Sequence, residues 1–297
     1  MTKTGTSPKV SIIIPTWNRA EYIMESVQSV MDQTYQNWEL IIVDDGSDDN
    51  TEEIILQIKD TRVQFCKAGK TGLGIKLKNR GMERSGGELI AFLDSDDIWA
   101  PDKLEKQVKA LNDHPDAGFS ITGGYNFKRP GQPVNYFYKE RKGLKYGDIF
   151  FSFFRSEAYA VPSALMFRRD CIPVIHEYVM TDPDSDVAFI LGLALNFKAV
   201  ILYEPLLYRR LHEESTTSMN WERGYREGIV LINLHKNKKN LPARVAKESL
   251  FRLYLHSGEK YLQRRQKLRA IKCFLNAWKN KPFSIIPIKK AGKAILY

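Results

Sequence analysis

Glu88-Leu-Ile-Ala-Phe-Leu-Asp-Ser-Asp-Asp97 joins an apolar run directly to a cluster of carboxylates. The run at residues 89–93 predicts a strand buried on both faces, as in a parallel sheet covered by helices. Carboxylates at the end of such a strand repel one another, which favours a cation between them. Oxygen ligands of this kind suit Mg²⁺ or Mn²⁺, which complete their shell with substrate phosphates. The alternative is a solvated acidic turn before a helix that begins near Pro101.

Strand and helix patterns alternate on the N-terminal side of this stretch. Apolar runs predict strands at residues 10–15, 40–43 and, more weakly, 63–66. Helical patterns occur at residues 23–31 and within 72–84, and a further helix is expected to start near Thr51. The alternation is typical of βαβ units and a parallel sheet. Ligands bind beyond the carboxyl ends of such strands. We therefore expect three polar strand ends to line one crevice, namely Pro15-Thr16, Asp44-Asp45 and Asp94-Ser95-Asp96.

Charge is distributed unevenly along the 297 residues. The chain is 43% hydrophobic and 27% charged, as expected for a globular protein. Residues 1–221 contain 26 Lys+Arg against 31 Asp+Glu, a net charge of −5. Residues 222–297 contain 19 against 4, a net charge of +15, and the two together give +10. A basic region is thus attached to a mildly acidic body, which favours a negatively charged partner for that region.

Signals for secretion or membrane insertion are not evident in the sequence. The polar N-terminus lacks the apolar segment of a signal peptide, and no apolar run approaches the roughly 18 residues of a membrane span. Three widely spaced cysteines favour a reducing compartment over a disulfide framework or a zinc site. These features predict a cytoplasmic location. A peripheral position on the inner face of the membrane is compatible with that prediction.

Several segments along the chain form a recognisable series. They are Val10-Ser-Ile-Ile-Ile-Pro-Thr-Trp-Asn-Arg19, Gln33-Thr34-Tyr35, Glu39-Leu-Ile-Ile-Val-Asp-Asp-Gly-Ser47, Asn79-Arg-Gly81, Gly87-Glu-Leu-Ile-Ala-Phe-Leu-Asp-Ser-Asp-Asp97 and Trp99-Ala-Pro-Asp-Lys-Leu104. Taken together, they resemble the family 2 inverting glycosyltransferases with a GT-A fold. The similarity covers residues 8–112 and continues more weakly to about residue 218. The resemblance implies an α/β fold of the Rossmann-like GT-A type, with a mixed sheet, helices on both faces and a C-terminal helical appendage.

The resemblance also implies a division of the chain. A GT-A domain would occupy residues 1–221, with a nucleotide-sugar-binding half at 8–112 and an acceptor half at 113–221. The basic C-terminal helical region would occupy residues 222–297. Residues 113–180 look irregular, apart from a strand predicted at 162–167, and the similarity there is poor.

Roles for site residues follow from the same resemblance. Asp44 would accept a hydrogen bond from uracil or another base, Asp45 would support that turn, and Asp96 would be the direct metal ligand beside Asp94. Lys78 stands where the family usually has arginine, which puts a bidentate contact in doubt. The remaining nucleotide-sugar-binding candidates are Pro15, Thr16, Lys76, Lys78, Asn79, Asp94 and Ser95.

A general base is required because the acceptor hydroxyl must lose a proton as it attacks the sugar. Aligning the apolar positions of residues 189–193 with those of the family places Asp186 at the base position, with Ser185 where glutamate is usual. Asp184 and Asp182 remain alternatives, and so does a purely structural role at the start of a helix. His212 is either a third metal ligand, a contact of the diphosphate, or an ordinary surface histidine.

The resemblance predicts a metal-dependent enzyme that transfers a sugar, with inversion, from a nucleotide sugar, preferably UDP-linked. The acceptor would be a surface glycan or a lipid-linked glycan, and the cofactor Mn²⁺ or Mg²⁺. One alternative is a nucleotidyltransferase that makes sugar nucleotides, although the turn at residues 16–19 lacks the glycine-rich loop it would need. The other is a non-catalytic protein that binds glycan or membrane. The basic C-terminal region would either lie on an anionic membrane or pack on the body.

Overall fold

The structure is a computed structural model that describes residues 7–72, 75–138, 141–159, 161–175, 186–212 and 221–296. Internal contacts divide the chain into two compact units. Unit 1 contains residues 1–149 and 159–212, and unit 2 contains residues 150–158 and 213–297. The predicted domain boundary at residue 221 stays a prediction, because the adjoining residues 213–220 lie outside the described ones.

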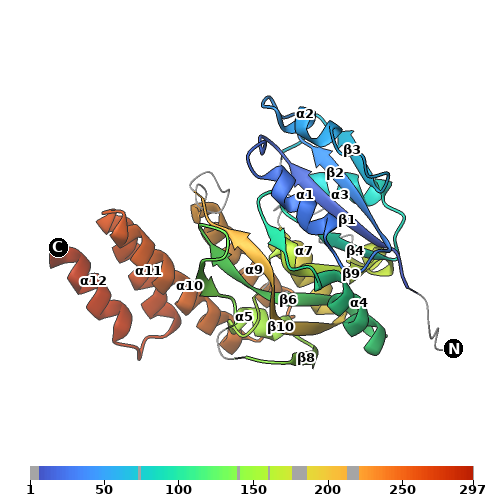
Figure 1. Ribbon diagram of the computed structural model, residues 1–297. Coiled ribbons are helices and arrows are strands. Elements are labelled where there is room, and N and C mark those ends of the chain that lie inside the picture. The colour runs from blue at the N-terminus through green and yellow to red at the C-terminus, as the bar shows by residue number, and fades with distance from the viewer. Residues whose placement is uncertain are drawn as a thin grey trace. The chain divides into compact units, whose positions relative to one another are not determined.

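Unit 1 is built on a single sheet, in which ten strands are described (Figure 1). The order along the sheet is β3-β2-β1-β4-β9-β6-β10-β5, and β7 and β8 pair with β6 and β10. The strands are β1 (Val10–Thr16), β2 (Trp38–Asp44), β3 (Val63–Lys67), β4 (Leu89–Phe92), β5 (Ile98–Trp99), β6 (Ala117–Phe127), β7 (Pro133–Tyr136), β8 (Leu144–Gly147), β9 (Leu165–Arg168) and β10 (Lys198–Arg210). Strands β1 to β4 are parallel to one another, whereas β9 pairs antiparallel with both β4 and β6. The sheet is therefore mixed, as predicted.

Helices cover both faces of this sheet. The helices of unit 1 are α1 (Ile23–Met31), α2 (Thr51–Leu56), α3 (Ile75–Arg84), α4 (Lys103–Asp113) and α7 (Asp186–Asn196). Ile12 and Ile14 share a core cluster with apolar residues of α1 and α4. Ile13, which points to the opposite face of β1, lies against α3 so closely that a Cβ on Gly81 would collide with it. On that face Phe92 also packs against Phe189 of α7, with ring centroids 5.6 Å apart.

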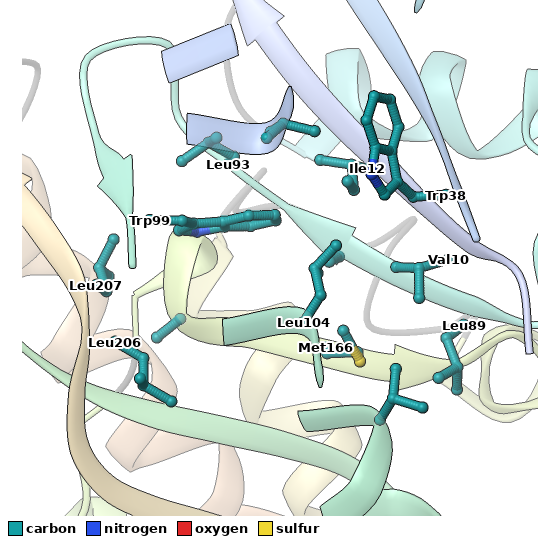
Figure 2. Packing of buried hydrophobic residues seen from close by; sticks show 14 of the residues in the cluster. Val10, Ile12, Trp38, Leu89, Leu93, Trp99, Leu104, Met166, Leu206 and Leu207 are labelled. Atoms are coloured by element: carbon teal, nitrogen blue, oxygen red, sulfur yellow. The ribbon is translucent and has the colours of Figure 1, made fainter. Parts of the chain in front are cut away.

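The main core runs along the strands and includes Leu93 and Trp99, which flank the acidic turn after β4. Figure 2 shows Trp99 between Leu93 and Leu207, with Leu104 and Met166 nearby. Trp99 is 2% exposed, and its Nε1 donates to the Ser163 carbonyl oxygen at 2.8 Å. This packing fixes β5 and the turn before it, which carries the acidic cluster.

The interpretation of residues 113–180 as largely irregular is wrong. Residues 117–127 form β6, an eleven-residue strand that pairs with β9 and β10. The segment predicted as a strand at 162–167 begins as a 3-10 turn, η1 (Pro162–Ala164), before β9 and a second turn, η2 (Arg169–Cys171). The acceptor half therefore contributes the far side of the same sheet.

Unit 2 is helical, with α5 (Phe150–Phe154), α9 (Trp221–Asn237), α10 (Ala243–Gln263), α11 (Lys267–Asn280) and α12 (Ile286–Leu296). The predicted hairpin of two amphipathic helices is present as α10 and α11 (Figure 1). The small core of the unit combines Trp221 and Tyr261 with Phe274 of α11 and two alanines of α12. The short helix α5 belongs to this unit, since Ser249 Oγ donates to the Phe154 carbonyl oxygen at 2.6 Å. Within the described residues, no helix combines the length and apolarity that a membrane crossing needs.

Candidate functional site

The turn after β2 is held together by its own carboxylates. Asp44 is 2% exposed, and its Oδ2 accepts hydrogen bonds from the backbone N–H groups of Gly46 and Ser47, both at 3.0 Å. Asp45 Oδ1 accepts from the backbone N–H of Thr71 at 2.6 Å and from its hydroxyl at 2.7 Å. Both acids predicted to bind or support the nucleotide therefore lie at the carboxyl end of β2. Asp45 ties this turn to the loop after β3.

The turn after β1 is tied to the turn after β2. The backbone N–H of Asp45 donates to the Thr16 carbonyl oxygen at 2.9 Å, which continues the pairing of the two strands. Asn18 donates to Asp48 Oδ1 at 2.5 Å and accepts from the Asp48 backbone N–H at 2.9 Å. Asp49, which follows it, accepts from the backbone N–H of Ala20 at 3.1 Å. The ends of β1 and β2 thus form one rigid rim.

Thr16 Oγ1 at the end of β1 and Asn79 Oδ1 on α3 are buried and have no hydrogen-bond partner in the described part of the chain. Buried polar groups are rarely left unpaired without a reason, and a missing ligand is one such reason. Pro15, like Thr16, is buried in β1, and Lys76 is exposed on α3. Ser95 is 7% exposed in the turn after β4.

Lys78 links two of the predicted site residues. Its ammonium nitrogen lies 2.9 Å from Asp186 Oδ1 and 3.3 Å from Asp94 Oδ1. The lysine side chain is 2% exposed, whereas the two carboxylates are 30% and 37% exposed. Lys78 therefore approaches from inside the protein, and the acids stand at the surface of the site. Asp186 is the first residue of α7, so the structure brings the predicted base close to the acidic turn after β4.

The pKa values of Lys78 and Asp94 are shifted by this arrangement. Burial alone would lower the pKa of Lys78, but attraction from Asp186 and then from Asp94 raises it above the ordinary value. Burial raises the pKa of Asp94, and the Lys78 charge opposes that rise. The cation expected beside the carboxylates is thus partly supplied by the chain itself.

Asp96 has a different set of partners. Its Oδ2 lies 2.9 Å from His212 Nε2 and 3.9 Å from Arg19 Nε. Burial would raise the pKa of Asp96, but the hydrogen bond with His212 and the charge of Arg19 hold it below the usual range. His212 Nδ1 is buried and has no hydrogen-bond partner among the described residues. His212 is therefore not an isolated surface histidine, and its ring also packs on Tyr22 at 5.0 Å between centroids.

Three residues that were not among the predicted site residues hold this turn. Asp97 is 3% exposed and accepts from Ser163 Oγ at 2.6 Å and from the backbone N–H of Arg210 at 3.1 Å. Ser163 in turn accepts from the backbone N–H of Asp94 at 3.0 Å, and Arg210 Nε donates to the Asp96 carbonyl oxygen at 3.1 Å. Asp97 stood in the quoted acidic stretch, but its partners are too distant in sequence to be recognised.

Metal binding is compatible with part of this arrangement. In the ranges that the structure describes, no three His, Cys, Asp or Glu side chains are grouped so that they could hold a metal ion together. Asp96 and His212 do form an adjacent oxygen and nitrogen pair. Asp94 faces Lys78 instead. The alternative bases Asp182 and Asp184 lie outside the described residues.

Comparison with known proteins places the chain in a family. Residues 11–173 match the family model described as glycosyl transferase family 2. The chain is 39% identical over 147 residues to a putative teichuronic acid biosynthesis glycosyltransferase, TuaG, of Bacillus subtilis. That match covers 49% of this chain and 58% of TuaG.

A further relative is named for a specific reaction. Over 102 residues the chain is 41% identical to an Escherichia coli protein, "UDP-Glc:alpha-D-GlcNAc-diphosphoundecaprenol beta-1,3-glucosyltransferase WfgD". This match covers 34% of this chain and 40% of WfgD. The chain therefore spans less than two thirds of the length of either named relative.

The fold has a solved counterpart. The crystal structure of residues 1–349 of Staphylococcus aureus TarS, in complex with UDP-GlcNAc, matches with a TM-score of 0.67 and 17% identity. The match covers 92% of this chain and 81% of the TarS chain. The predicted GT-A fold, with its mixed sheet and C-terminal helices, is confirmed by this similarity.

Proposed function

This chain belongs to glycosyl transferase family 2, and on that premise we propose that it transfers a sugar from a UDP-linked donor to an acceptor hydroxyl with inversion. We further propose that the acceptor is a surface polysaccharide or a lipid-linked glycan. The names of TuaG and WfgD support this acceptor class. A lipid-linked acceptor would be presented at a bilayer, so the proposal includes contact of the basic residues 222–297 with an anionic membrane.

The observation that carries the proposal is the position of Asp186. The Lys78 ammonium nitrogen lies 2.9 Å from the Asp186 carboxylate and 3.3 Å from the Asp94 carboxylate, so it holds the two acids in one group. A base must lie within hydrogen-bond reach of the acceptor hydroxyl, on the side of the sugar opposite the leaving diphosphate. An Asp186 oxygen directed to solvent could take that proton while the other remains bonded to Lys78. A single displacement of this kind inverts the configuration at the sugar carbon.

The nucleotide would bind along the rim formed by the ends of β1 and β2. Thr16 Oγ1 and Asn79 Oδ1 are buried polar atoms without partners in the described residues, so a ligand there would satisfy them. Asp44 would meet the base, although two backbone N–H groups of its own turn already bind one of its oxygens. That arrangement fixes the direction of the carboxylate before the donor arrives.

Asp96 and His212 would hold a divalent ion, and Asp94 would stand beside it. An oxygen and an imidazole nitrogen fit Mn²⁺ better than Mg²⁺, which takes mainly oxygen ligands. When bound, such an ion neutralises the charge that develops on the leaving diphosphate. Arg19, which lies 3.9 Å from Asp96, carries a further positive charge at the same place.

A direct test is a screen of nucleotide sugars for thermal stabilisation with and without Mn²⁺, since a ligand that binds the folded state raises its melting temperature. We expect UDP-linked sugars to stabilise the protein, and Asp96→Ala to remove the metal-dependent part of the effect. If no nucleotide sugar stabilises the native protein, the proposed function is wrong.

Asp186→Asn separates binding from chemistry. The variant should keep the donor-dependent thermal shift and lose roughly 10²- to 10⁴-fold in kcat, the range expected when a general base is removed. Asp113→Asn is the matched control, because Asp113 is an exposed carboxylate at the end of α4. If Asp186→Asn lowers stability slightly but leaves kcat unchanged, Asp186 serves only as a helix-terminal acid.

A further inference from the structure

Helix α12 turns its small residues, rather than its large apolar ones, toward the protein interior. Its inward positions are Pro287, Ala291 and Ala294, at the i, i+4, i+7 spacing of one face, and all three are buried. Ile285, just before the helix, and Ile288 within it are 60% and 52% exposed. The small residues thus face α11 and the small core of unit 2, while the large β-branched residues face outward. An ordinary surface helix has the reverse arrangement.

The exposed apolar residues gather where α11 ends and α12 begins. Phe283, in the connecting turn, is fully exposed, and Ile286 is 49% exposed. Trp278 and Leu275, in the last part of α11, are 37% and 50% exposed. We call this surface the α11–α12 tip, defined by Leu275, Trp278, Phe283, Ile285, Ile286 and Ile288. Single exposed apolar residues are common, but six of them around one helix–helix connection point to a binding surface.

The surroundings of the tip carry one sign of charge. Residues 260–297 contain eleven Lys and Arg and no Asp or Glu. Two of these lysines reach back to acids of α10, Lys281 to Glu248 at 3.3 Å and Lys290 to Glu259. Four others are exposed on α11 and α12. Lys272, Lys279 and Lys289 are close in sequence to tip residues of the same helix, and Lys293 follows on α12.

We propose that the α11–α12 tip docks on the surface of a bilayer that contains anionic phospholipid. Phe283 and the neighbouring isoleucines enter the boundary between headgroups and acyl chains, and these exposed lysines contact the phosphates. Interfacial helices combine an apolar face with a basic polar one in this way. At eleven residues α12 is too short to span a bilayer, so it lies along the surface.

The side chains at the tip favour lipid over other anionic partners. A single-stranded nucleic acid is bound through several aromatic side chains on which bases stack, whereas four of the six tip residues are aliphatic: Leu275, Ile285, Ile286 and Ile288. An acidic protein would complement the lysines but would not require a fully exposed phenylalanine at the apex of a turn. Docking on lipid uses the apolar and the basic residues together. This inference rests on the membrane contact included in the proposed function and names the residues that make it, but it does not require the transfer reaction itself.

The test is flotation of the full chain with vesicles of equal parts phosphatidylcholine and phosphatidylglycerol. We expect the native protein to float with these vesicles and to bind pure phosphatidylcholine far more weakly. Phe283→Asp should lower the partition coefficient at least roughly tenfold, because it places a charge where an apolar ring enters the membrane. Each of Lys279→Gln and Lys289→Gln should lower it by about fivefold, the equivalent of one lysine near an anionic surface.

Leu268→Asp is the matched control for Phe283→Asp. Leu268 is 85% exposed at the start of α11, so the substitution makes the same change in charge at the end of that helix remote from the tip. We expect less than a twofold effect. Equal losses in the two variants, or no flotation of the native protein, would overturn the proposal, as would binding to an RNA oligonucleotide without binding to vesicles.

The docking proposal and the proposed enzymatic function can be refuted independently of each other. Phe283→Asp should keep the native circular dichroism spectrum and should transfer sugar to a water-soluble acceptor at the native rate. A loss of flotation with activity retained supports the docking surface. Intact flotation in a protein that uses no nucleotide sugar would contradict the transferase function alone.

Discussion

The acids after β2 and the acids after β4 end neighbouring parts of the same sheet, yet they are held in opposite ways. After β2, Asp44 and Asp45 are bonded to backbone N–H groups and hydroxyls. After β4, Asp94 faces the Lys78 ammonium, and Asp96 faces His212 and Arg19. Asp44 and Asp45 thus accept from neutral donors, whereas Asp94 and Asp96 each lie near a positively charged side chain, although neutral hydrogen bonds to Asp97 also hold the β4 turn.

This difference suggests a division of labour. Neutral hydrogen bonds fix a shape without supplying a charge, which suits a rim that recognises a nucleotide. Carboxylates balanced by cations keep a local charge that can be redistributed when a diphosphate arrives. If the division is correct, substitutions at the β4 turn should cost more than equivalent ones at the β2 turn.

Lys78→Met should produce the largest loss of stability. It removes the charge but keeps most of the side-chain volume, and it leaves Asp94 and Asp186 near each other without a cation. Breaking a buried ion pair costs 3–5 kcal/mol, and partial exposure of both acids reduces this to about 2–3 kcal/mol. Urea unfolding at neutral pH measures the loss.

Arg80→Met on the same helix is the control. Arg80 lies 3.5 Å from Glu83, and both side chains are more than half exposed, so its removal should cost about 0–1 kcal/mol. If Lys78→Met costs no more than Arg80→Met, the two acids do not depend on Lys78.

Thr71→Val tests the neutral side of the comparison. It deletes the 2.7 Å hydrogen bond from the Thr71 hydroxyl to Asp45 and leaves the backbone hydrogen bond in place. We expect a loss of about 1 kcal/mol in the free energy of unfolding. Thr34→Val removes a hydroxyl bond to an exposed carboxylate, Glu105, and should have a smaller effect. A cost for Thr71→Val equal to that of Lys78→Met would contradict the division of labour.

The N-terminal strands could be predicted because each has a hydrophobic pattern contained in its own residues. β1, β2 and β4 are short apolar runs that end in polar residues, and all three appear where they were expected. β6 was missed because Gly123 and Gly124 suggest a turn. A Cβ at Gly123 would lie 2.5 Å from the Tyr203 carbonyl oxygen, so glycine permits the close approach of β10 there. That requirement depends on a strand about 80 residues away and leaves no local pattern.

The site, too, has a part that could be predicted from the sequence and a part that could not. The acids could be named from the sequence, since they follow directly from the strand ends. Lys78 and Asp186 were also named, but their pairing could not be predicted because they are 108 positions apart. The partner of Asp97, Ser163, was missed because it lies 66 positions away. Only the completed sheet brings these residues together.

Asp49→Asn, the smallest expected effect, tests whether the β2 turn responds to acid. Burial raises the pKa of Asp49, but hydrogen bonds from the Thr51 hydroxyl and from the Ala20 and Thr51 backbone together lower it overall. Because the folded pKa lies below the unfolded one, the unfolded state binds more protons in that interval. The stability that Asp49 contributes is therefore present above about pH 4, the usual range of an unfolded aspartate, and is lost as the pH falls through the folded pKa. Since Asp49 is exposed, the free energy of unfolding of the native protein should exceed that of the variant by under about 1 kcal/mol at neutral pH. Urea unfolding at neutral and acidic pH should show that gap closing in acid, whereas a gap independent of pH would mean that the carboxylate charge plays no part in holding the turn.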